Sequence, residues 1–329
     1  MANCHGVDVV AGAGIMIAMN HRLTHSVINR CVWPADGDIL VPDHTVCIIG
    51  TTDLKSDDAD NLPIPADQVQ QMLDSGEAMI PGFRKARAVH AWAGARPLIK
   101  DSRVSATDTR HMARGMSIID HNARDGVYGM LTIAGGKLTT YRVMAADAVD
   151  FALGEQAKQN PSVTATIGLV GADGYHAIAA NRARYAERYG WDEDRITHLL
   201  ERYGAQIEDL GALIDADPSL GAPLAKAPQF LRADVVFAVR YEGALHLEDV
   251  LVRRVRLDLE QRDRGLAAAD EILDIMRAEL GWDDKKVKEE LDLYAARVAA
   301  MREAESTSTD AEASAKIEAV APVAPRVKL

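Results

Sequence analysis

Two glycine-containing stretches have residue types and spacing that could support ligand binding. In the first, Val9 to His21, the residues Gly12, Gly14 and Ala18 fit the dinucleotide-binding pattern G-x-G-x-x-A. That pattern binds a pyrophosphate only when a helix begins directly after the glycines. Residues 15–30 have no long amphipathic helix pattern. We therefore interpret the first stretch as glycine and alanine in a buried strand.

The second stretch, residues 129–153, is more specific. An apolar run from Met130 to Ala134 predicts a strand, and Gly135 and Gly136 follow it. Two glycines permit a tight turn and the close approach of a planar ligand. A helix should begin just after Thr139 or Thr140, and its N-terminus would face a negatively charged group. An ordinary strand–glycine–helix connection is the alternative for this stretch alone.

The elements that position these residues follow from the apolar pattern of the first half. Four short apolar runs are separated by turn residues: 14–20, 26–33, 38–42 and 45–52. They predict an antiparallel sheet. The polar residues 56–65 predict a loop, and a helix is expected from Ala66 to Met79. Three further short strands are expected within residues 90–98, 115–121 and 129–136.

The second half of the chain has helical patterns. We place a domain boundary in the polar connection between Phe151 and Gly174. Within 245–264, one predicted helix face consists of Leu247, Val250, Leu251, Val255 and Leu259. Three arginines there, Arg253, Arg254 and Arg256, are expected on a solvated face, with contact to a partner or to lipid headgroups as the alternative. Another amphipathic helix is expected over 283–303, and a tail without periodicity follows.

Composition excludes several classes of protein. The chain has 329 residues, 48% of them hydrophobic, and this length allows two domains with separate cores. A net charge of −12 argues against nucleic acid as a partner. Three unevenly spaced cysteines favour a reducing cytoplasmic compartment, without disulfides or zinc, and we expect no metal site. The longest apolar run, Val9 to Met19, is too short to span a bilayer and lacks a signal-peptide pattern.

Several motifs, taken together and in order, resemble the FAD-dependent glycerol-3-phosphate dehydrogenases. They are HRLTHSVINRCVWPADGDILVP at 21–42, IIGTTD at 48–53, AGARPL at 93–98 and GGKLTTYRVMA at 135–145. Looser similarity continues in RYGWDEDRI, VRYEGALHLEDVLVRRVRL and AAADEIL of the helical part. The resemblance implies oxidation of sn-glycerol 3-phosphate to dihydroxyacetone phosphate, with hydride passed to FAD and electrons to quinone or another acceptor. It also implies a cytoplasmic location, with peripheral association at the inner face of the membrane.

The resemblance also implies site residues. Arg96 of the ARPL motif would bind the substrate phosphate through paired, charge-assisted hydrogen bonds, with Arg114 as a second candidate. A salt bridge within the sheet is the alternative for Arg96. Thr51, Thr52 and Asp53 would lie beside the active-site cavity, although a plain polar turn is equally open.

The flavin would lie over the double-glycine turn. The expected cofactor-binding residues are Gly135, Gly136, Lys137, Leu138, Thr139 and Thr140. Lys137 would reach the substrate or the flavin, so Arg96 and Lys137 are the expected catalytic residues. The positive end of the following helix would stabilise the charge that a reduced flavin gains near N1 and the C2 oxygen. No histidine is evident as the general base.

The implied fold is mixed α+β and α/β. We expect part of an antiparallel substrate-binding sheet domain at 1–90, the C-terminal part of an FAD-binding domain at 91–155, an all-α C-terminal domain at 165–303 and a disordered tail at 304–329. The family's N-terminal G-x-G-x-x-G unit has no counterpart here. Activity should therefore need the missing N-terminal half. The chain would be either a truncated gene product or one piece of a split enzyme whose other chain supplies the nucleotide-binding domain, and the oligomeric state, a homodimer included, stays open. The alternative is a non-catalytic truncated fragment whose helical part is an interaction module.

Overall fold

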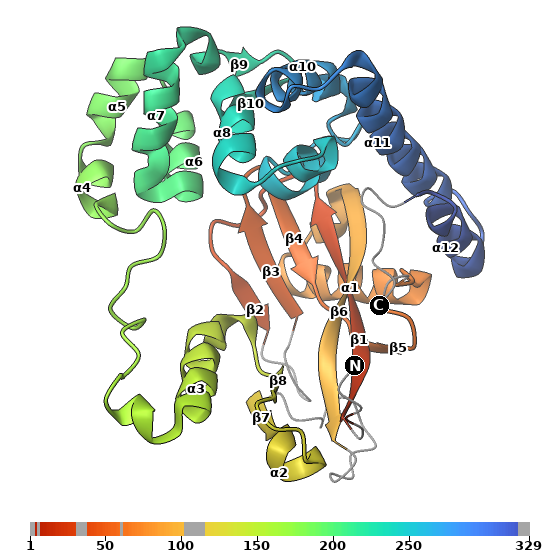
Figure 1. The fold of residues 1–329 in the computed structure, drawn as a ribbon. Helices are drawn as coiled ribbons and strands as arrows, with labels where there is room; N and C mark the ends of the chain where they lie inside the picture. Colours follow the sequence, from red (N-terminus) through yellow and green to blue (C-terminus); the bar gives the residue numbers. More distant parts are fainter. Residues whose placement is uncertain (1–3, 5–6, 31–37, 60–61, 102–115, 322–329) are drawn as a thin grey trace.

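A long antiparallel ribbon organises the first part of the molecule (Figure 1). The computed structural model describes residues 4, 7–30, 38–59, 62–101 and 116–321. Strand β1 (Val7–Met19) pairs with β6 (Ala88–Asp101) along its whole length. On its other edge β1 pairs with β4 and β5, and β3 and β2 continue the sheet beyond β4. The bounds of these strands are Ile28–Arg30 for β2, Asp38–Asp43 for β3, Val46–Gly50 for β4 and Leu54–Ser56 for β5.

The predicted antiparallel sheet is confirmed, and so is the prediction that the first glycine pattern lies in a strand. Gly12, Gly14 and Ala18 all lie within β1. At Gly14 an added Cβ would come within 2.5 Å of the Thr52 carbonyl oxygen and still closer to Thr51 Oγ1. The strand therefore needs glycine at this position for close packing against another strand end, and not for a phosphate.

One face of the sheet is covered by helix α1 (Ala66–Met79), at the predicted residues. Their shared core contains the fully buried side chains Ile15, Ile17, Met19, Leu40, Ile49, Met72 and Phe83. The alternation along β1 sends Ile15, Ile17 and Met19 to this face, as the two-residue period of a strand requires.

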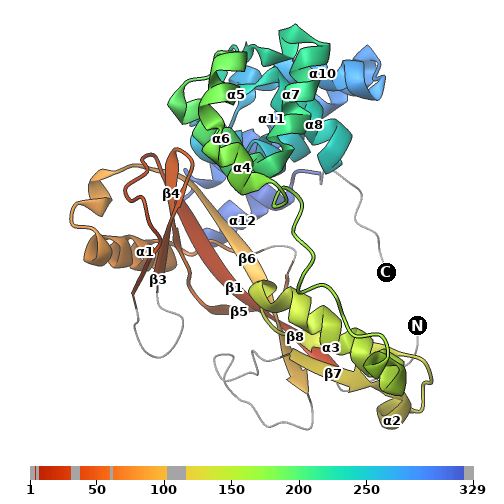
Figure 2. The ribbon, with the colours of Figure 1, turned by 90° about the vertical axis from the view of Figure 1, so that its left-hand side faces the viewer.

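A separate hairpin unit lies at the far end of the β1–β6 ribbon from the helical part (Figures 1 and 2). Strand β7 (Met116–Asp120) leads into the short helix α2 (His121–Asp125), and β8 (Leu131–Gly135) returns antiparallel to β7. Helix α3 (Tyr141–Leu153) follows and packs against β8, while β8 also contacts β6. The expected boundary between residues 90 and 91 falls inside β6, so strand pairing continues across it.

The rest of the chain is helical and has two contiguous cores. Its main helices are α4 (Tyr175–Ala180), α5 (Arg182–Tyr189), α6 (Glu193–Tyr203), α7 (Ile207–Ala216), α8 (Arg232–Glu242), α9 (Leu257–Glu260), α10 (Ala269–Leu280) and α11 (Asp284–Ala304). A small ribbon of β9 (Pro223–Leu224) and β10 (Ala227–Leu231) connects α7 to α8. The expected antiparallel sheet followed by a helical domain is therefore confirmed.

Two expectations for the helical part are wrong. The predicted continuous helix over 245–264 is broken into a π-helical segment, Asp249–Arg254, and α9, because Arg256 adopts a left-handed backbone conformation with φ 59°. Its five apolar residues are nevertheless all buried. The tail expected to be disordered contains helix α12 (Asp310–Glu318), which packs against α11. Thr309 caps this helix, and Asp310 accepts a hydrogen bond from the backbone of Ala66 at 3.3 Å.

Candidate functional site

The ends of two strands bring Arg96 together with Thr51, Thr52 and Asp53. Arg96 lies opposite Gly12 on the β1–β6 ribbon, and the other three residues follow β4. The guanidinium donates to Thr51 Oγ1 at 3.3 Å and to the Thr52 carbonyl oxygen at 3.3 and 3.4 Å. Its Nη1 lies 3.5 Å from Asp53 Oδ1. All these contacts are long, and about a third of the side chain is exposed, so the guanidinium retains donors for an anion.

Thr52 fixes this strand end. Its side chain is buried, and its Oγ1 accepts a hydrogen bond from the backbone N–H of Ile15 at 3.1 Å. The same hydroxyl donates to Gln68 of α1. With Gly14 leaving room for Thr51, the sheet core holds the strand end in one position. Thr52 is therefore a supporting residue of the Arg96 cluster rather than an exposed ligand.

The double-glycine turn has the backbone that the sequence predicts. Gly135 and Gly136 have φ values of 74° and 80°, a region that side chains disfavour. Thr140 occupies the N-cap of α3, yet its hydroxyl bonds to the Lys137 carbonyl oxygen at 2.9 Å instead of capping the helix. A 3-10 turn, Leu138–Thr140, leads directly into α3, so the backbone N–H of Tyr141 donates to the Leu138 carbonyl oxygen and that of Thr140 to Lys137 at 3.0 Å.

Lys137, Leu138, Thr139 and Thr140 are all exposed, and Leu138 has 88% of its surface open to solvent. Among the residues that the structure describes, no hydrogen bond or ion pair joins this turn to the Arg96 cluster. The structure thus assembles the predicted residues into two groups, one on β4 and β6 and one between β8 and α3. Arg114 lies outside the described residues.

The chain matches two family models. Residues 3–142 match the model described as FAD dependent oxidoreductase, and residues 162–287 match the C-terminal domain of alpha-glycerophosphate oxidase. The glycerol-3-phosphate dehydrogenase of Mycobacterium leprae (strain TN) is 43% identical over 210 residues, which are 64% of this chain and 34% of that protein. Glycerol-3-phosphate dehydrogenase 2 of Mycobacterium tuberculosis (strain ATCC 25618 / H37Rv) is 40% identical over 210 residues, with the same 64% and 34% coverage.

The two family models and these relatives make the chain similar to the FAD-dependent glycerol-3-phosphate dehydrogenases. The predicted resemblance is thereby confirmed. A crystal structure of the glycerol-3-phosphate dehydrogenase from Bacillus halodurans complexed with FAD has the same fold, with a TM-score of 0.63 at 21% identity. The aligned part covers 89% of this chain and 57% of that one. The chain spans about a third of the length of the curated relatives it matches.

The β3–β4 turn of the sheet contacts the helical domain. His44 at the turn places Nδ1 2.5 Å from Glu260 Oε1, and its ring contacts that of His198, with centroids 4.0 Å apart and the rings tilted by 33°. Asp43 forms an ion pair with Arg256 at 2.7 Å. Burial, with the positive groups nearby, lowers the pKa of His198 to about 3, so His198 stays neutral in this contact.

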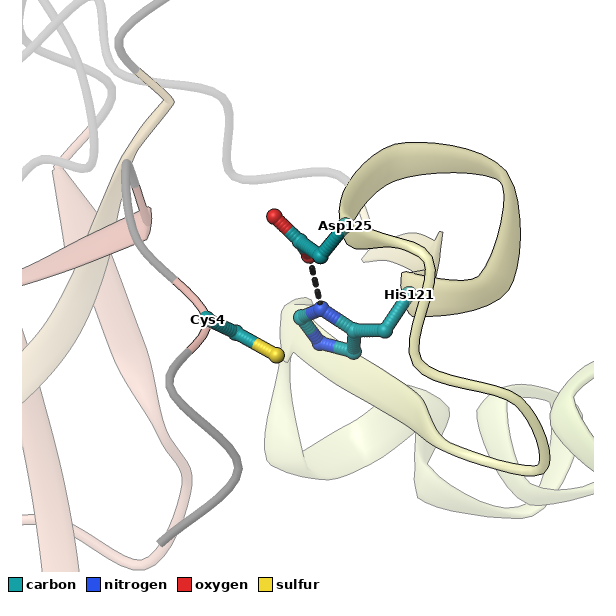
Figure 3. Close-up of side chains that lie close together, drawn as sticks. All are labelled: Cys4, His121 and Asp125. Carbon is teal, nitrogen blue, oxygen red and sulfur yellow. Dashed lines mark hydrogen bonds and ion pairs between the residues drawn. The ribbon is translucent and has the colours of Figure 1, made fainter.

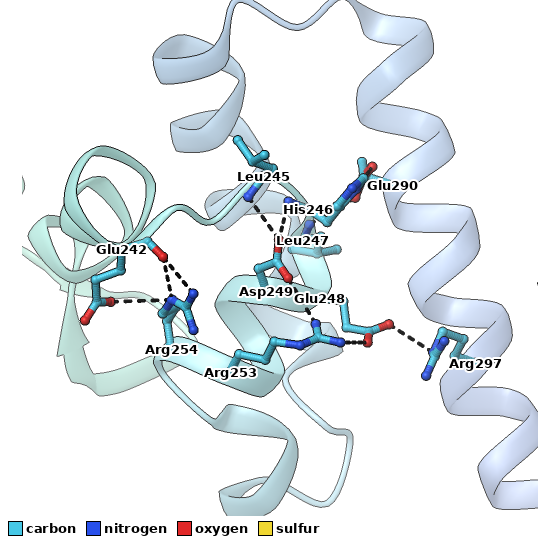
Figure 4. A network of polar contacts seen from close by, with 10 residues as sticks. All are labelled: Glu242, Leu245, His246, Leu247, Glu248, Asp249, Arg253, Arg254, Glu290 and Arg297. Atoms are coloured by element: carbon cyan, nitrogen blue, oxygen red, sulfur yellow. Dashed lines mark hydrogen bonds and ion pairs between the residues drawn. The ribbon is translucent and has the colours of Figure 1, made fainter. Parts of the chain in front are cut away.

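The arginines of the helical domain are engaged within the molecule (Figure 4). Arg253 binds Glu248 at 2.8 Å and Asp249 at 3.1 Å, and Arg254 donates to the Glu242 carbonyl oxygen at 2.7 Å. The side chains of Arg253 and Arg256 are 47% and 43% exposed, so these two arginines lie on a solvated face as expected, while Arg254 is half-buried. Asp249 and Arg253 are four residues apart, whereas the partner of Arg256, Asp43, is distant in sequence.

A cavity of about 360 Å³ separates β6 from the helical domain and contains titratable residues that the sequence analysis missed. His90 and Asp258 both line it, with His90 Nε2 4.0 Å from Asp258 Oδ2. Burial, together with the charge of Arg264, lowers the pKa of His90 to about 3. Burial raises the pKa of Asp258 to about 7 against the opposing effect of Arg264 and Arg256. The cavity therefore keeps both groups neutral between about pH 3 and pH 7.

One structural observation concerns whether a helix of the chain could cross a membrane. Within the described residues, no helix combines the length and the apolar composition needed to cross a bilayer.

Proposed function

We propose that this chain supplies the substrate-binding sheet and the helical C-terminal domain of an FAD-dependent glycerol-3-phosphate dehydrogenase. The reaction is the oxidation of sn-glycerol 3-phosphate to dihydroxyacetone phosphate, with electrons passed to quinone or another acceptor. The family models and the relatives' names support this reaction. The observation that carries the proposal is the partly exposed Arg96 guanidinium, whose long contacts leave donors for a phosphate.

Arg96 binds the substrate phosphate in this proposal. A guanidinium matches a phosphate dianion through two parallel charge-assisted hydrogen bonds. Thr51 keeps the guanidinium plane in place, and Asp53 limits how far the cation can turn. Arg114 is the proposed second phosphate ligand. Binding the phosphate fixes the far end of a three-carbon substrate, so the reacting carbon is positioned before the chemical step.

The turn residues Gly135 and Gly136 fit a planar flavin. Their positive φ values form a tight turn directly before α3, and the missing side chain of Gly136 makes room for Met144. The positive end of α3 would favour the negative charge of a reduced flavin. A flavin held there would supply the hydride acceptor for the substrate. Lys137, Leu138, Thr139 and Thr140 border the flavin, and the exposed Lys137 amino group can turn toward the ring or the substrate.

Domain roles follow from this assignment. Residues 1–90 form the substrate-binding sheet, 91–155 contribute the flavin end of the FAD-binding domain, and 165–303 form the helical domain. In this proposal a nucleotide-binding N-terminal portion, on the same or another polypeptide, contacts the adenine end of FAD. We further propose a cytoplasmic enzyme that associates peripherally with the inner face of the membrane, where a quinone is available, and a homodimer as the assembly to test.

The test is an anaerobic visible spectrum of the purified chain mixed with FAD, before and after addition of sn-glycerol 3-phosphate. Retained flavin that bleaches with the substrate supports the proposal. Flavin that is retained but does not bleach would contradict the substrate assignment. Absence of retained flavin would favour a non-catalytic helical interaction module, unless addition of a nucleotide-binding partner restores it.

A further inference from the structure

A cysteine, a histidine and an aspartate lie together beside the β7–β8 hairpin (Figure 3). Cys4 precedes β1, whereas His121 and Asp125 are the first and last residues of α2. One ligand atom from each, the thiol sulfur, an imidazole nitrogen and a carboxylate oxygen, lie within 4.8 Å of one another. The cluster therefore joins the segment before β1 to a hairpin that is distant in sequence.

The imidazole of this cluster is fixed on both sides. His121 is only 3% exposed, and its Nδ1 lies 2.5 Å from Asp125 Oδ2. Its Nε2 lies 2.7 Å from the hydroxyl of Thr132 on β8. A histidine that binds a metal through one nitrogen is normally oriented by a hydrogen bond at the other, and Thr132 supplies such a partner.

The ligand types select the ion. Thiolate, imidazole and carboxylate are all zinc ligands, with metal–ligand distances of about 2.0–2.3 Å that place tetrahedral ligands roughly 3.3–3.8 Å apart. The observed spread of 4.8 Å or less is close to this range, so small side-chain rotations suffice. Calcium and magnesium prefer oxygen ligands and are disfavoured by sulfur and nitrogen.

A nucleophilic cysteine is the competing interpretation of the same three residues. Such a cysteine needs a depressed pKa, because the thiolate is the reactive form. Burial raises the pKa of the Cys4 thiol, and the neighbouring Asp125 carboxylate raises it further. A zinc ion would reverse this effect by displacing the thiol proton. Arg124 approaches Asp125 at its other oxygen, Oδ1, with Nε 3.8 Å away.

We propose that Cys4, His121 and Asp125 bind one zinc ion, with water in the fourth position, and that this ion ties the segment before β1 to the β7–β8 hairpin. The site is independent of the proposed dehydrogenase activity, since none of its ligands belongs to the Arg96 cluster or the double-glycine turn.

The experiment uses the untagged full chain, stripped with a chelator and titrated with Co²⁺ as a spectroscopic substitute for zinc. We expect one Co²⁺ per chain and a thiolate-to-cobalt charge-transfer band, which stoichiometric Zn²⁺ then removes. Cys4→Ser should abolish the band. Thr132→Val keeps all three ligands and removes only the imidazole's outer partner, so it should weaken metal affinity by about 10-fold.

Cys47→Ala is the matched control, since Cys47 is a buried thiol of β4 in the sheet core. It should leave the band and the stoichiometry unchanged, and circular dichroism establishes that each variant is folded. Because binding releases the thiol proton, affinity should rise with pH. A folded chain that binds no stoichiometric metal, or a band that survives in Cys4→Ser, would overturn the proposal and leave a hydrogen-bonded cluster only.

Discussion

At the scale of single residues, Arg96 illustrates how a site residue differs from a structural ion pair. A structural arginine is normally held by short, well-aligned hydrogen bonds, whereas the contacts of Arg96 all lie between 3.3 and 3.5 Å. The family resemblance named Arg96 and its neighbours Thr51, Thr52 and Asp53, but the contacts between them were not predictable, because β4 and β6 are brought together only by their separate pairing with β1. The zinc ligands were missed for the same reason: Cys4 lies far from α2 in sequence.

Replacing Arg96 by methionine tests its role. Arg96→Met keeps the length of the side chain and removes the charged donors, so the substrate concentration needed for half-maximal flavin bleaching should rise roughly 10- to 100-fold, the equivalent of about 1.5–3 kcal/mol. Arg87→Met, at an exposed arginine just before β6, is the control and should leave this concentration unchanged. Equal effects of the two substitutions would contradict the proposed phosphate contact.

Asp258 should make stability depend on pH. An unfolded chain releases this proton near pH 4, whereas the folded chain retains it to about pH 7. The unfolded state therefore binds fewer protons between pH 4 and 7, so this group lowers the free energy of unfolding as pH rises through that window. The Asp258→Asn variant has no carboxyl group at this position, so it does not show this decrease in the free energy of unfolding. The stability difference between variant and parent should grow by up to about 4 kcal/mol between pH 4 and 8.

Urea unfolding at the two pH values measures this difference. His90, whose pKa is lowered to about 3, gives the opposite slope below pH 6.5, since the unfolded state then binds more protons. That contribution is present in both proteins and cancels when they are compared. A difference that does not change with pH would mean that Asp258 is ionised inside the folded protein.

At the scale of elements, the sequence predicted the strands and helices whose positions depend on local residue patterns. The alternation of β1 and the polar loop before α1 placed these elements within a few residues. The break at Arg256 and helix α12 escaped prediction, because burial of Leu247 and Leu259 is equally compatible with one helix or two. Helix α12 has only a weak apolar pattern and forms where it can pack on α11 and receive a hydrogen bond from α1.

The paired glycines of the β1–β6 ribbon give a prediction at this scale. Gly14 and Gly94 lie directly opposite each other, yet an added Cβ at Gly14 meets the Thr52 carbonyl oxygen at 2.5 Å, whereas at Gly94 the first contact is Met16 Cε at 3.7 Å. Gly14→Ala should therefore destabilise the chain by about 1–3 kcal/mol and displace Thr51. Gly94→Ala should be neutral or slightly stabilising. Urea unfolding of both variants measures the two effects. Similar stabilities of the two variants would mean that the strand end after β4 is easily displaced.

At the scale of the whole molecule, the two ends of the β1–β6 ribbon differ in how completely they are covered. The helical domain packs against one end through contacts with His44 and Asp43, and the cavity around Asp258 lies beside these contacts. At the other end, the hairpin and α3 have few neighbours (Figure 2). Large apolar side chains are exposed there, namely Tyr128, Ile133, Leu138, Tyr141, Val143, Val149 and Phe151. Exposed large apolar side chains gathered at one end of a molecule often mark contact with another polypeptide.

This exposed face predicts how the isolated chain behaves in solution. The double substitution Val149→Lys with Phe151→Lys should reduce binding of a hydrophobic dye and concentration-dependent association, because both side chains are about half exposed. Stability should change by only about 0.5 kcal/mol, since neither side chain belongs to a core. Val163→Lys, at an exposed apolar residue of the connection to the helical domain, is the control and should alter neither property. If the α3 variant instead lost stability by several kcal/mol, the face would be packed against this same chain, and a nucleotide-binding partner would have to dock elsewhere.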